Sequence, residues 1–327
     1  MNPSRRASVS PLPPVGGAGA SGGWREVDRD GAAEVAPGRG PLAALRRGAG
    51  VARAVLASSP TAMAGAVILG VHVVLAVLGP TVAPYHYAQF NILHTLEAPS
   101  REFLGGTDQY GRDQLSRVMW GARSTLLLAT ASTLLGVGLG LLVGMLGAFY
   151  RGLVDEVLMR VVDALMALPA LLLAMLLLTT VGANPVYVAL GIAVVFMPRS
   201  ARVVRGVALS LAASEFIDAA RARGERGLYI IFCEMLPNAW APIIVELTIR
   251  FAYAILLATS LGFLGLGAQP PAPDWGLMIN EALPFLAQAP WLAILPAAAI
   301  STAVVGANLL GDALQEALAL GRMGEAP

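Results

Sequence analysis

The fold is decided by residues 126–149, which read LLLATASTLLGVGLGLLVGMLGAF. This run holds no charged side chain and is long enough to cross the roughly 30 Å hydrocarbon core of a bilayer as one helix. Within it, glycines at 136, 140, 144 and 147 recur every three or four positions, which places them on one helix face. Small residues on a helix face let a neighbouring backbone approach closely. We therefore predict a membrane-spanning helix that packs tightly against another helix.

Other apolar runs of spanning length lie on both sides of this one. They predict an all-α polytopic membrane protein with six transmembrane helices, the remaining five being 62–80, 157–181, 186–197 with its flanking residues, 241–266 and 291–310. The chain is 56% hydrophobic and 13% charged, and its mean hydropathy is +0.68. A water-soluble core of this size would not bury so much apolar surface. The first predicted partner is therefore the lipid bilayer.

The basic residues exclude two classes of function. All 22 of them are Arg, so a Walker A loop, which needs a Lys, cannot form in this chain. Any ATP and Mg must then be bound by partner chains. A formal net charge of +1 argues against a nucleic-acid binder. The single Cys233 and three scattered His give no metal-ligand spacing, and no catalytic constellation lies in the spans. We predict a non-enzymatic chain without a cofactor or metal of its own.

The Arg residues also predict the topology. Residues 1–58 are rich in Pro, Gly and Arg, so we expect a disordered tail in the cytoplasm, where basic loops concentrate. Six crossings through 59–315 would return the tail 316–327 to the cytoplasm. The basic loops after the second and fourth spans agree with this orientation, whereas four basic residues between the first two spans oppose it: Arg101, Arg112, Arg117 and Arg123.

Few charged residues fall inside the predicted spans. Glu246 and Arg250 stand one helical turn apart, with the acid first, and this order favours a structural ion pair over a substrate contact. Arg160 and Asp163 suggest a second local pair in the same way. The scarcity of buried acids argues against a proton-coupled or sodium-coupled secondary transporter.

The loop at 206–238, between the fourth and fifth spans, carries a more specific pattern. Ser214 is expected to cap a short helix at 215–223, and Gly224 to end it in the left-handed conformation. A second helix at 226–235 should stop at Leu236–Pro237. The helix at 215–223 combines small, apolar and basic residues, which suits docking into a groove of another protein. An amphipathic helix lying on the membrane surface is the alternative, and the residues alone leave both open.

A family resemblance bears on that choice. The pattern Asp218-Ala219-Ala220-x3-Gly224, followed by Leu236-Pro237, resembles the Glu-Ala-Ala loop of permease subunits of ATP-binding-cassette importers. The resemblance implies that this helix couples to a cleft in an ATPase subunit. Asp218 replaces the usual Glu, and Glu234 stands where an apolar residue is expected. The candidate coupling residues are Glu215, Phe216, Ile217, Asp218, Ala219, Ala220, Arg221, Arg223, Gly224, Leu236 and Pro237.

Two further stretches narrow the family. The pattern Gly-Thr-Asp-x-x-Gly-Arg-Asp at 106–113 and the segment 263–276 are similar to the C-type permease of dipeptide, oligopeptide and nickel importers, over roughly 63–310. The resemblance implies half of a translocation pathway in the bacterial cytoplasmic (inner) membrane, working by alternating access. It also implies a second homologous permease subunit, one or two ATPase subunits that hold ATP and Mg, and an extracytoplasmic substrate-binding protein. Two alternatives remain: a secondary transporter or channel that works without ATPase partners, and a structural or assembly subunit.

The loop before the second span supplies the other candidate site. Its charges alternate in sign, so we expect them to pair locally, either as a cap on that span or as an outer gate that receives the binding protein. After the proline-rich segment 269–273, Trp275 is expected to anchor at the membrane interface. Asp274 departs from the small residue expected before it. The candidate outer residues are Thr107, Asp108, Gly111, Arg112, Asp113, Arg117 and Trp275.

Overall fold

A computed structural model describes residues 59–182 and 184–323, and these residues are almost entirely helical. In this part of the chain the only β-type pairing is one isolated antiparallel bridge between Thr107 and Asp113. The predicted tail at 1–58 lies outside the described residues, as do 324–327. The predicted all-α class is confirmed.

Nine helices of eight or more residues make up the described part. They are α2 (Pro60–Val82), α3 (Gln114–Tyr150), α4 (Gly152–Met166), α5 (Ala170–Val181), α6 (Pro185–Ala212), α7 (Glu215–Ala222), α10 (Trp240–Phe263), α11 (Trp275–Ala282) and α12 (Trp291–Met323). Five short elements complete it: η1 (Ile92–His94), α8 (Gly227–Tyr229), η2 (Ile230–Met235), α9 (Leu236–Asn238) and η3 (Leu283–Phe285). Five helices are long and apolar enough to cross a membrane, or six crossings if the bent pair α4 and α5 counts as one.

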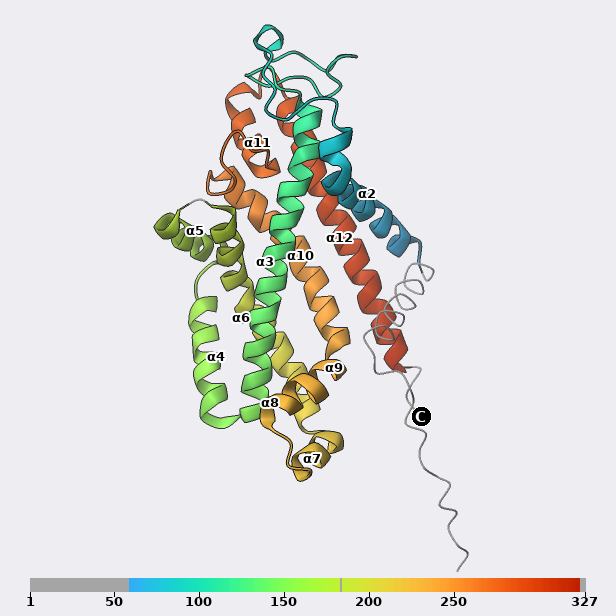
Figure 1. The fold of residues 1–327 in the computed structure, drawn as a ribbon, viewed down its shortest axis with the longest axis vertical. Coiled ribbons are helices and arrows are strands. Elements are labelled where there is room, and N and C mark those ends of the chain that lie inside the picture. Colours follow the sequence, from blue (N-terminus) through green and yellow to red (C-terminus); the bar gives the residue numbers. More distant parts are fainter. Residues whose placement is uncertain (1–58, 183, 324–327) are drawn as a thin grey trace, which may run out of the picture. The chain divides into compact units, whose positions relative to one another are not determined.

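Helix α3 pairs closely with α6, as Figure 1 shows. A Cβ added at Gly140 would lie 2.6 Å from the Ser200 Cβ, and one at Gly144 would lie 2.6 Å from the Ala201 carbonyl oxygen. Gly136 faces α6 in the same way, whereas Gly147 faces Asp155 of α4. The predicted close approach along the glycine face is therefore confirmed for three of the four positions.

Helix α3 starts much earlier than the apolar run that predicted it. It begins at Gln114 because the carboxylate of Asp113 accepts a hydrogen bond from the Ser116 N–H at 2.8 Å, which caps the first turn. At 37 residues the helix is about 55 Å long, well beyond the hydrocarbon core. Part of the predicted outer loop, including Arg117, thus belongs to this helix.

The fourth span is also longer than predicted. Helix α6 continues through Pro198 to Ala212, so Arg199, Arg202 and Arg205 lie on a helix and not in a loop. Two of these arginines pair with acids of α4: Arg205 with Asp155, and Arg202 with Asp163. This pairing lets charged residues remain inside a long helix, and the hydrophobic run alone did not reveal it.

The predicted third span is not one straight helix. Helices α4 and α5 meet at an angle of 90°. The break falls at Pro169, which has no N–H to donate and disfavours the helical conformation of the residue before it. The chain therefore turns sharply in the middle of an apolar run.

The predicted stop at Leu236–Pro237 is wrong. The helix continues to Asn238 because η2 is a wider, π-type turn, in which the Leu236 N–H donates to the Ile231 carbonyl. This register accommodates the missing N–H of Pro237. The helix ends after Asn238, and the N–H of the following Ala239 donates to the Met235 carbonyl at 3.0 Å.

The two largest clusters of buried apolar side chains in the described residues hold most of the bundle together. One lies beneath α11 and includes Trp275, Ile192 and Ile255. The other packs α7 and η2 against α3 and α6, and includes Ile217 and Met145. Helices α7 and α11 lie at opposite ends of the long helix α3 (Figure 1), so we refer below to the α7 end and the α11 end.

Candidate functional site

The loop at the α7 end folds as a short helix that begins at Glu215 as predicted and ends at Ala222, one residue before the predicted end. Ser214 has extended backbone geometry, and its carbonyl accepts from the Ile217 N–H at 3.0 Å. Its hydroxyl, however, donates to the Ser210 carbonyl, so the predicted side-chain cap is wrong. Gly224 has φ +78°, as predicted for the residue that ends the helix. Substitution at Gly224 would strain the backbone without meeting any neighbouring atom.

Helix α7 has one buried face and one exposed face. Ile217 and Ala220 are fully buried and pack against the core of the α7 end. Phe216, by contrast, leaves 37% of its surface exposed. Of these two adjacent apolar residues, Ile217 therefore holds the helix against the bundle and Phe216 faces outward. The other exposed candidates are Glu215, Asp218, Ala219, Arg221, Arg223, Gly224 and Pro237, while Leu236 is half-buried.

Several charged contacts surround α7. The Arg221 guanidinium lies 5.3 Å from the centre of the Phe149 ring on α3 and 3.2 Å from the Asp218 carboxylate. Arg223 lies 2.8 Å from Glu225 and 3.8 Å from Glu234. The unusual Glu234 therefore bridges the two helical parts of the loop.

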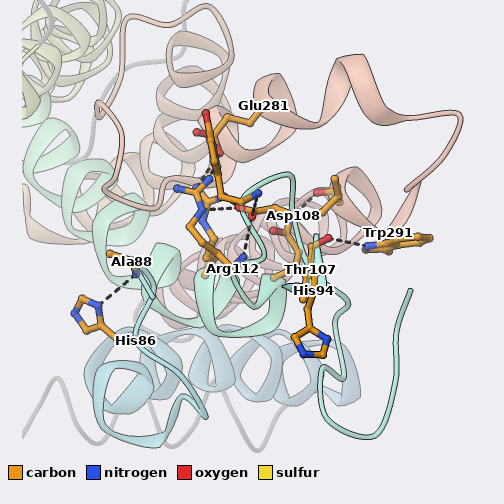
Figure 2. Close-up of polar contacts among 12 residues, drawn as sticks. His86, Ala88, His94, Thr107, Asp108, Arg112, Glu281 and Trp291 are labelled. Carbon is orange, nitrogen blue, oxygen red and sulfur yellow. Dashed lines mark hydrogen bonds and ion pairs between the residues drawn. The ribbon is translucent and has the colours of Figure 1, made fainter. Parts of the chain in front are cut away.

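At the α11 end, four charged side chains form a closed group, which we call the ionic cluster: Asp108, Arg112, Arg117 and Glu281. Arg112 and Arg117 each contact Asp108, at 2.6 and 2.7 Å, and each contacts Glu281, at 3.3 and 2.8 Å. The two arginines and Asp108 are at most 2% exposed. Figure 2 shows Arg112 and Glu281 directed toward one another. With two positive and two negative groups, the cluster is neutral, which is what a buried site requires.

The predicted local pairing is only partly correct. Asp108 pairs with both arginines, but Asp113 caps α3, and Arg123 is exposed on that helix. Glu281 was missed. It is the one acidic residue between Asp274 and Asp312, and an isolated acid in an apolar stretch is a signal that a buried partner exists. The cluster therefore joins the 104–113 loop and the start of α3 to α11.

The loop itself is held by its own polar contacts. The carboxylate of Asp108 accepts from the N–H groups of Tyr110 and Arg112, both at 2.9 Å. The Thr107 hydroxyl accepts from the Glu97 N–H at 2.8 Å and donates to the His94 carbonyl. Thr107 also presents its carbonyl to the Trp291 indole at 3.5 Å (Figure 2). These contacts fix the loop as a rigid cap.

Gly111 is required by this loop on two grounds. Its φ is +69°, a left-handed conformation that favours glycine. A Cβ at this position would also lie 1.8 Å from the Asn91 carbonyl oxygen, far inside van der Waals contact. The glycine of the Gly-Thr-Asp-x-x-Gly-Arg-Asp pattern therefore lets two loop segments touch.

Trp275 is not an interfacial anchor, contrary to the prediction. It is 0% exposed, and its indole N–H donates to the Val118 carbonyl of α3 at 2.9 Å. Gly121 makes room for the ring, because a Cβ there would lie 2.9 Å from the indole Cδ1. The Asp274 carboxylate caps α11 by accepting from the Gly276 and Leu277 N–H groups at 3.0 Å. This cap directs α11 inward and carries Trp275 into the core.

Further ionic pairs lie within the long helices and, in one case here, between two of them. Glu246 and Arg250 form the predicted pair at 2.6 Å, and the Ser200 hydroxyl donates to Glu246 at 2.8 Å. The predicted Arg160–Asp163 pair is wrong: Arg160 pairs with Glu156 and Asp163 with Arg202. Across residues 59–182 and 184–323, no group of three or more His, Cys, Asp or Glu side chains is arranged to hold a metal ion.

Comparison with known proteins identifies the family of this chain. Residues 136–322 match the binding-protein-dependent transport system inner membrane component, and residues 50–99 match the N-terminal transmembrane domain of oligopeptide transport permease C. The chain is 38% identical over 267 residues to the dipeptide transport system permease protein DppC of Alkalihalophilus pseudofirmus, covering 80% of this chain and 86% of the relative.

Two further relatives carry related names. The di/tripeptide transport system permease protein DppC of Pseudomonas aeruginosa is 38% identical, over 79% of this chain and 87% of its own. The glutathione transport system permease protein GsiD of Escherichia coli is 38% identical, over 79% of this chain and 85% of its own. The chain therefore belongs to the family of binding-protein-dependent transport system inner membrane components, as a multi-pass permease of the ABC-transporter class.

Proposed function

We propose that this chain forms half of the translocation pathway of a bacterial peptide importer and that α7 couples it to separate ATPase subunits. The observation that carries the proposal is the division of α7 into a buried face and an exposed face. Ile217 and Ala220 fix the helix to the bundle, while Phe216 and its charged neighbours face outward. A rigidly held helix with an apolar residue inside a charged rim suits a groove on another protein.

The partners follow from what the chain lacks. Without Lys it has no Walker A loop, so one or two partner ATPase subunits would hold ATP and Mg. A second, homologous permease subunit would supply the other half of the pathway. The relatives' names refer to dipeptides, di/tripeptides and glutathione. They favour peptides over nickel as the transported solute, with a separate binding protein delivering it.

The orientation follows from the basic residues. Arg221, Arg223 and Arg226 are exposed at the α7 end, and basic loops are retained in the cytoplasm. The α7 end would then be cytoplasmic, with both chain termini on that side, and the α11 end would face the binding protein. In this orientation the ionic cluster forms an outer cap that closes one side of the pathway.

The mechanism would be alternating access. Closure of the ATPase subunits on ATP would move α7, and the packed pair of α3 and α6 would carry that motion toward the α11 end. Coupling of this kind needs an element with two arrangements whose balance each partner shifts. The tight glycine contacts between α3 and α6 support a motion in which these two helices move together.

Co-purification tests the coupling assignment. The tagged chain is expressed with its neighbouring subunits as wild type, Phe216→Ala, Asp218→Arg and the control Glu156→Gln, whose side chain pairs only with the exposed Arg160. We expect both α7 variants to lose the ATPase subunit and to lower ATP-driven dipeptide uptake about tenfold or more. Their abundance in the membrane should match that of the wild type and the control.

The outcomes separate the remaining classes. If the wild type transports peptide but retains no ATPase, the chain is a secondary transporter. If uptake is normal when the chain is deleted, it is an assembly subunit. If both α7 variants keep the ATPase and full uptake, the docking assignment is wrong even though the transport function stands.

A further inference from the structure

A cavity of about 210 Å³ lies between α5, α6 and α10, and neither end of the bundle includes it. Its polar groups come from Arg199 of α6 and from Arg250, Tyr253 and Ser260 of α10, and Phe196 and Leu256 contribute apolar walls. All of the polar groups lie on helices that are long and apolar enough to cross the membrane. The cavity is thus a partly polar space at membrane depth.

The Arg199 side chain is exposed on the surface of this single chain. It is near the middle of α6, which spans Pro185–Ala212, so it is about 20 Å along the axis from either helix end. Because α6 is long and apolar enough to cross a membrane, this position would fall between the two membrane surfaces. Arginines at this depth face a water-filled path or a bundle interior and mark substrate pathways.

Arg199 is the first of three arginines along α6, and it differs from the other two. Arg202 and Arg205 pair with acids on α4. Helix α4 ends at Met166 and the chain turns by 90° into α5, so beside Arg199 the neighbouring segment is apolar, with Ala170 and Leu171. Among the residues with described side chains, none forms a hydrogen bond or an ion pair with Arg199.

Arg250 is held in place on the opposite wall. Its guanidinium Nε donates to Glu246 at 2.6 Å, and its centre lies 6.0 Å from the Phe196 ring and 5.9 Å from the Tyr253 ring. Glu246 neutralises Arg250, so the positive charge of Arg199 is left over. The cavity therefore favours an anion, and a guanidinium suits the planar, two-oxygen shape of a carboxylate.

We propose that this cavity is a binding site on the peptide pathway, where Arg199 binds the C-terminal carboxylate of the transported peptide. The apolar walls at Phe196 and Leu256 would contact the terminal side chain. The inference rests on the proposed function of peptide import and adds to it a recognition site inside the membrane, distinct from the site on the binding protein.

Photocrosslinking tests the proposed binding site directly. The complex that co-purifies with the full chain is placed in lipid nanodiscs with a dipeptide that ends in p-benzoylphenylalanine, either as the free acid or as the C-terminal amide. We expect the acid to label Tyr253, Leu256 or Leu257, as mapped by mass spectrometry, and the amide to label them about tenfold less. Arg199→Gln should reduce labelling by the acid to the level of the amide. Arg202→Gln, one helical turn away, should label like the wild type.

Each outcome is decisive. Equal labelling by the acid and the amide in the wild type, which requires no variant to fold, overturns the inference. Labelling that is unchanged in Arg199→Gln also overturns it, whereas labelling that persists in Arg199→Lys supports a charge-based contact. If the wild type shows neither a co-purified ATPase nor peptide uptake, the proposed function is refuted. If it takes up peptide but shows no acid-selective labelling, only the proposed binding site is refuted.

Discussion

Arg117 and Glu281 lie 164 positions apart in the chain, and their side chains meet at 2.8 Å. This contact fastens the first turns of α3 to α11, and Asp108 and Arg112 complete the group on the loop side. The short helix α11 therefore cannot shift without disturbing the start of the longest helix in the described part of the chain. Any opening at the α11 end must move these elements together or break the ionic cluster.

Removing Glu281 should destabilise the protein strongly. Glu281→Ala leaves two nearly fully buried arginines with a single carboxylate, and removing one partner of a buried pair costs about 3 kcal/mol or more. We expect a clear fall in the apparent Tm of the detergent-solubilised protein. The control Glu156→Gln, which breaks an exposed pair on α4, should change stability by less than about 1 kcal/mol. Equal effects of the two changes would contradict the assigned burial.

Two glycines on α3 offer a matched pair of substitutions. Gly140→Ala places a Cβ 2.6 Å from the Ser200 Cβ of α6, whereas a Cβ at Gly138 has nothing within 4 Å. We expect Gly140→Ala to destabilise by about 1–3 kcal/mol through overpacking. Gly138→Ala should be neutral or stabilise by up to about 1 kcal/mol, because alanine favours a helix. Thermal unfolding of the two variants side by side measures the difference, and a reversed order would refute the close packing.

Substitutions on the two faces of α7 should have different effects, one on the stability of the protein and the other on partner binding. Ile217→Ala removes a fully buried side chain and should cost about 2–4 kcal/mol. Phe216→Ala, at the adjacent exposed position, should leave the Tm almost unchanged while it impairs partner binding. Unfolding curves and co-purification of the same two variants check both halves of this prediction. If Phe216→Ala lowers the Tm as much as Ile217→Ala, its ring is part of the core.

The cap of α11 should make stability depend on pH. Burial raises the pKa of the Asp274 carboxyl, against the opposing effect of the Leu277 and Gly276 N–H groups. The folded protein then holds the proton more tightly than the unfolded chain, so this group's contribution to stability falls as the pH rises from about 3.9 toward the raised pKa. Asp274→Asn keeps an oxygen to cap the helix but does not titrate.

The measurement is the Tm of the wild type and of Asp274→Asn across this pH range. The variant should gain stability relative to the wild type with increasing pH. Asp274→Ala, which loses the cap, should be less stable than the Asn variant by about 1 kcal/mol at every pH. A difference between wild type and Asn variant that does not change with pH would contradict the raised pKa.

Much of the helical framework could be predicted from local patterns. Apolar length predicted the membrane-crossing helices, and the glycine spacing of 136–149 predicted that one face of α3 packs closely against another helix, since both depend on residues within one segment. Gly224 likewise marked the end of α7. Prediction failed at α6, which extends through its arginines because the distant helix α4 supplies acids. It also failed at Pro237, which lies within a helix because the directly preceding turn widens.

The sequence by itself determined the class of protein, the approximate spans and the family motifs at both ends of the bundle, because hydrophobic length, helical periodicity and turn residues act locally. The tertiary structure alone decided that Glu281 completes the ionic cluster, that Trp275 is buried against Gly121, and that Arg199 faces a cavity without an acid beside it. Each of these depends on which segments meet in space. Burial and charge compensation depend on contacts between segments that are distant in the sequence, so residue spacing along the chain does not predict them.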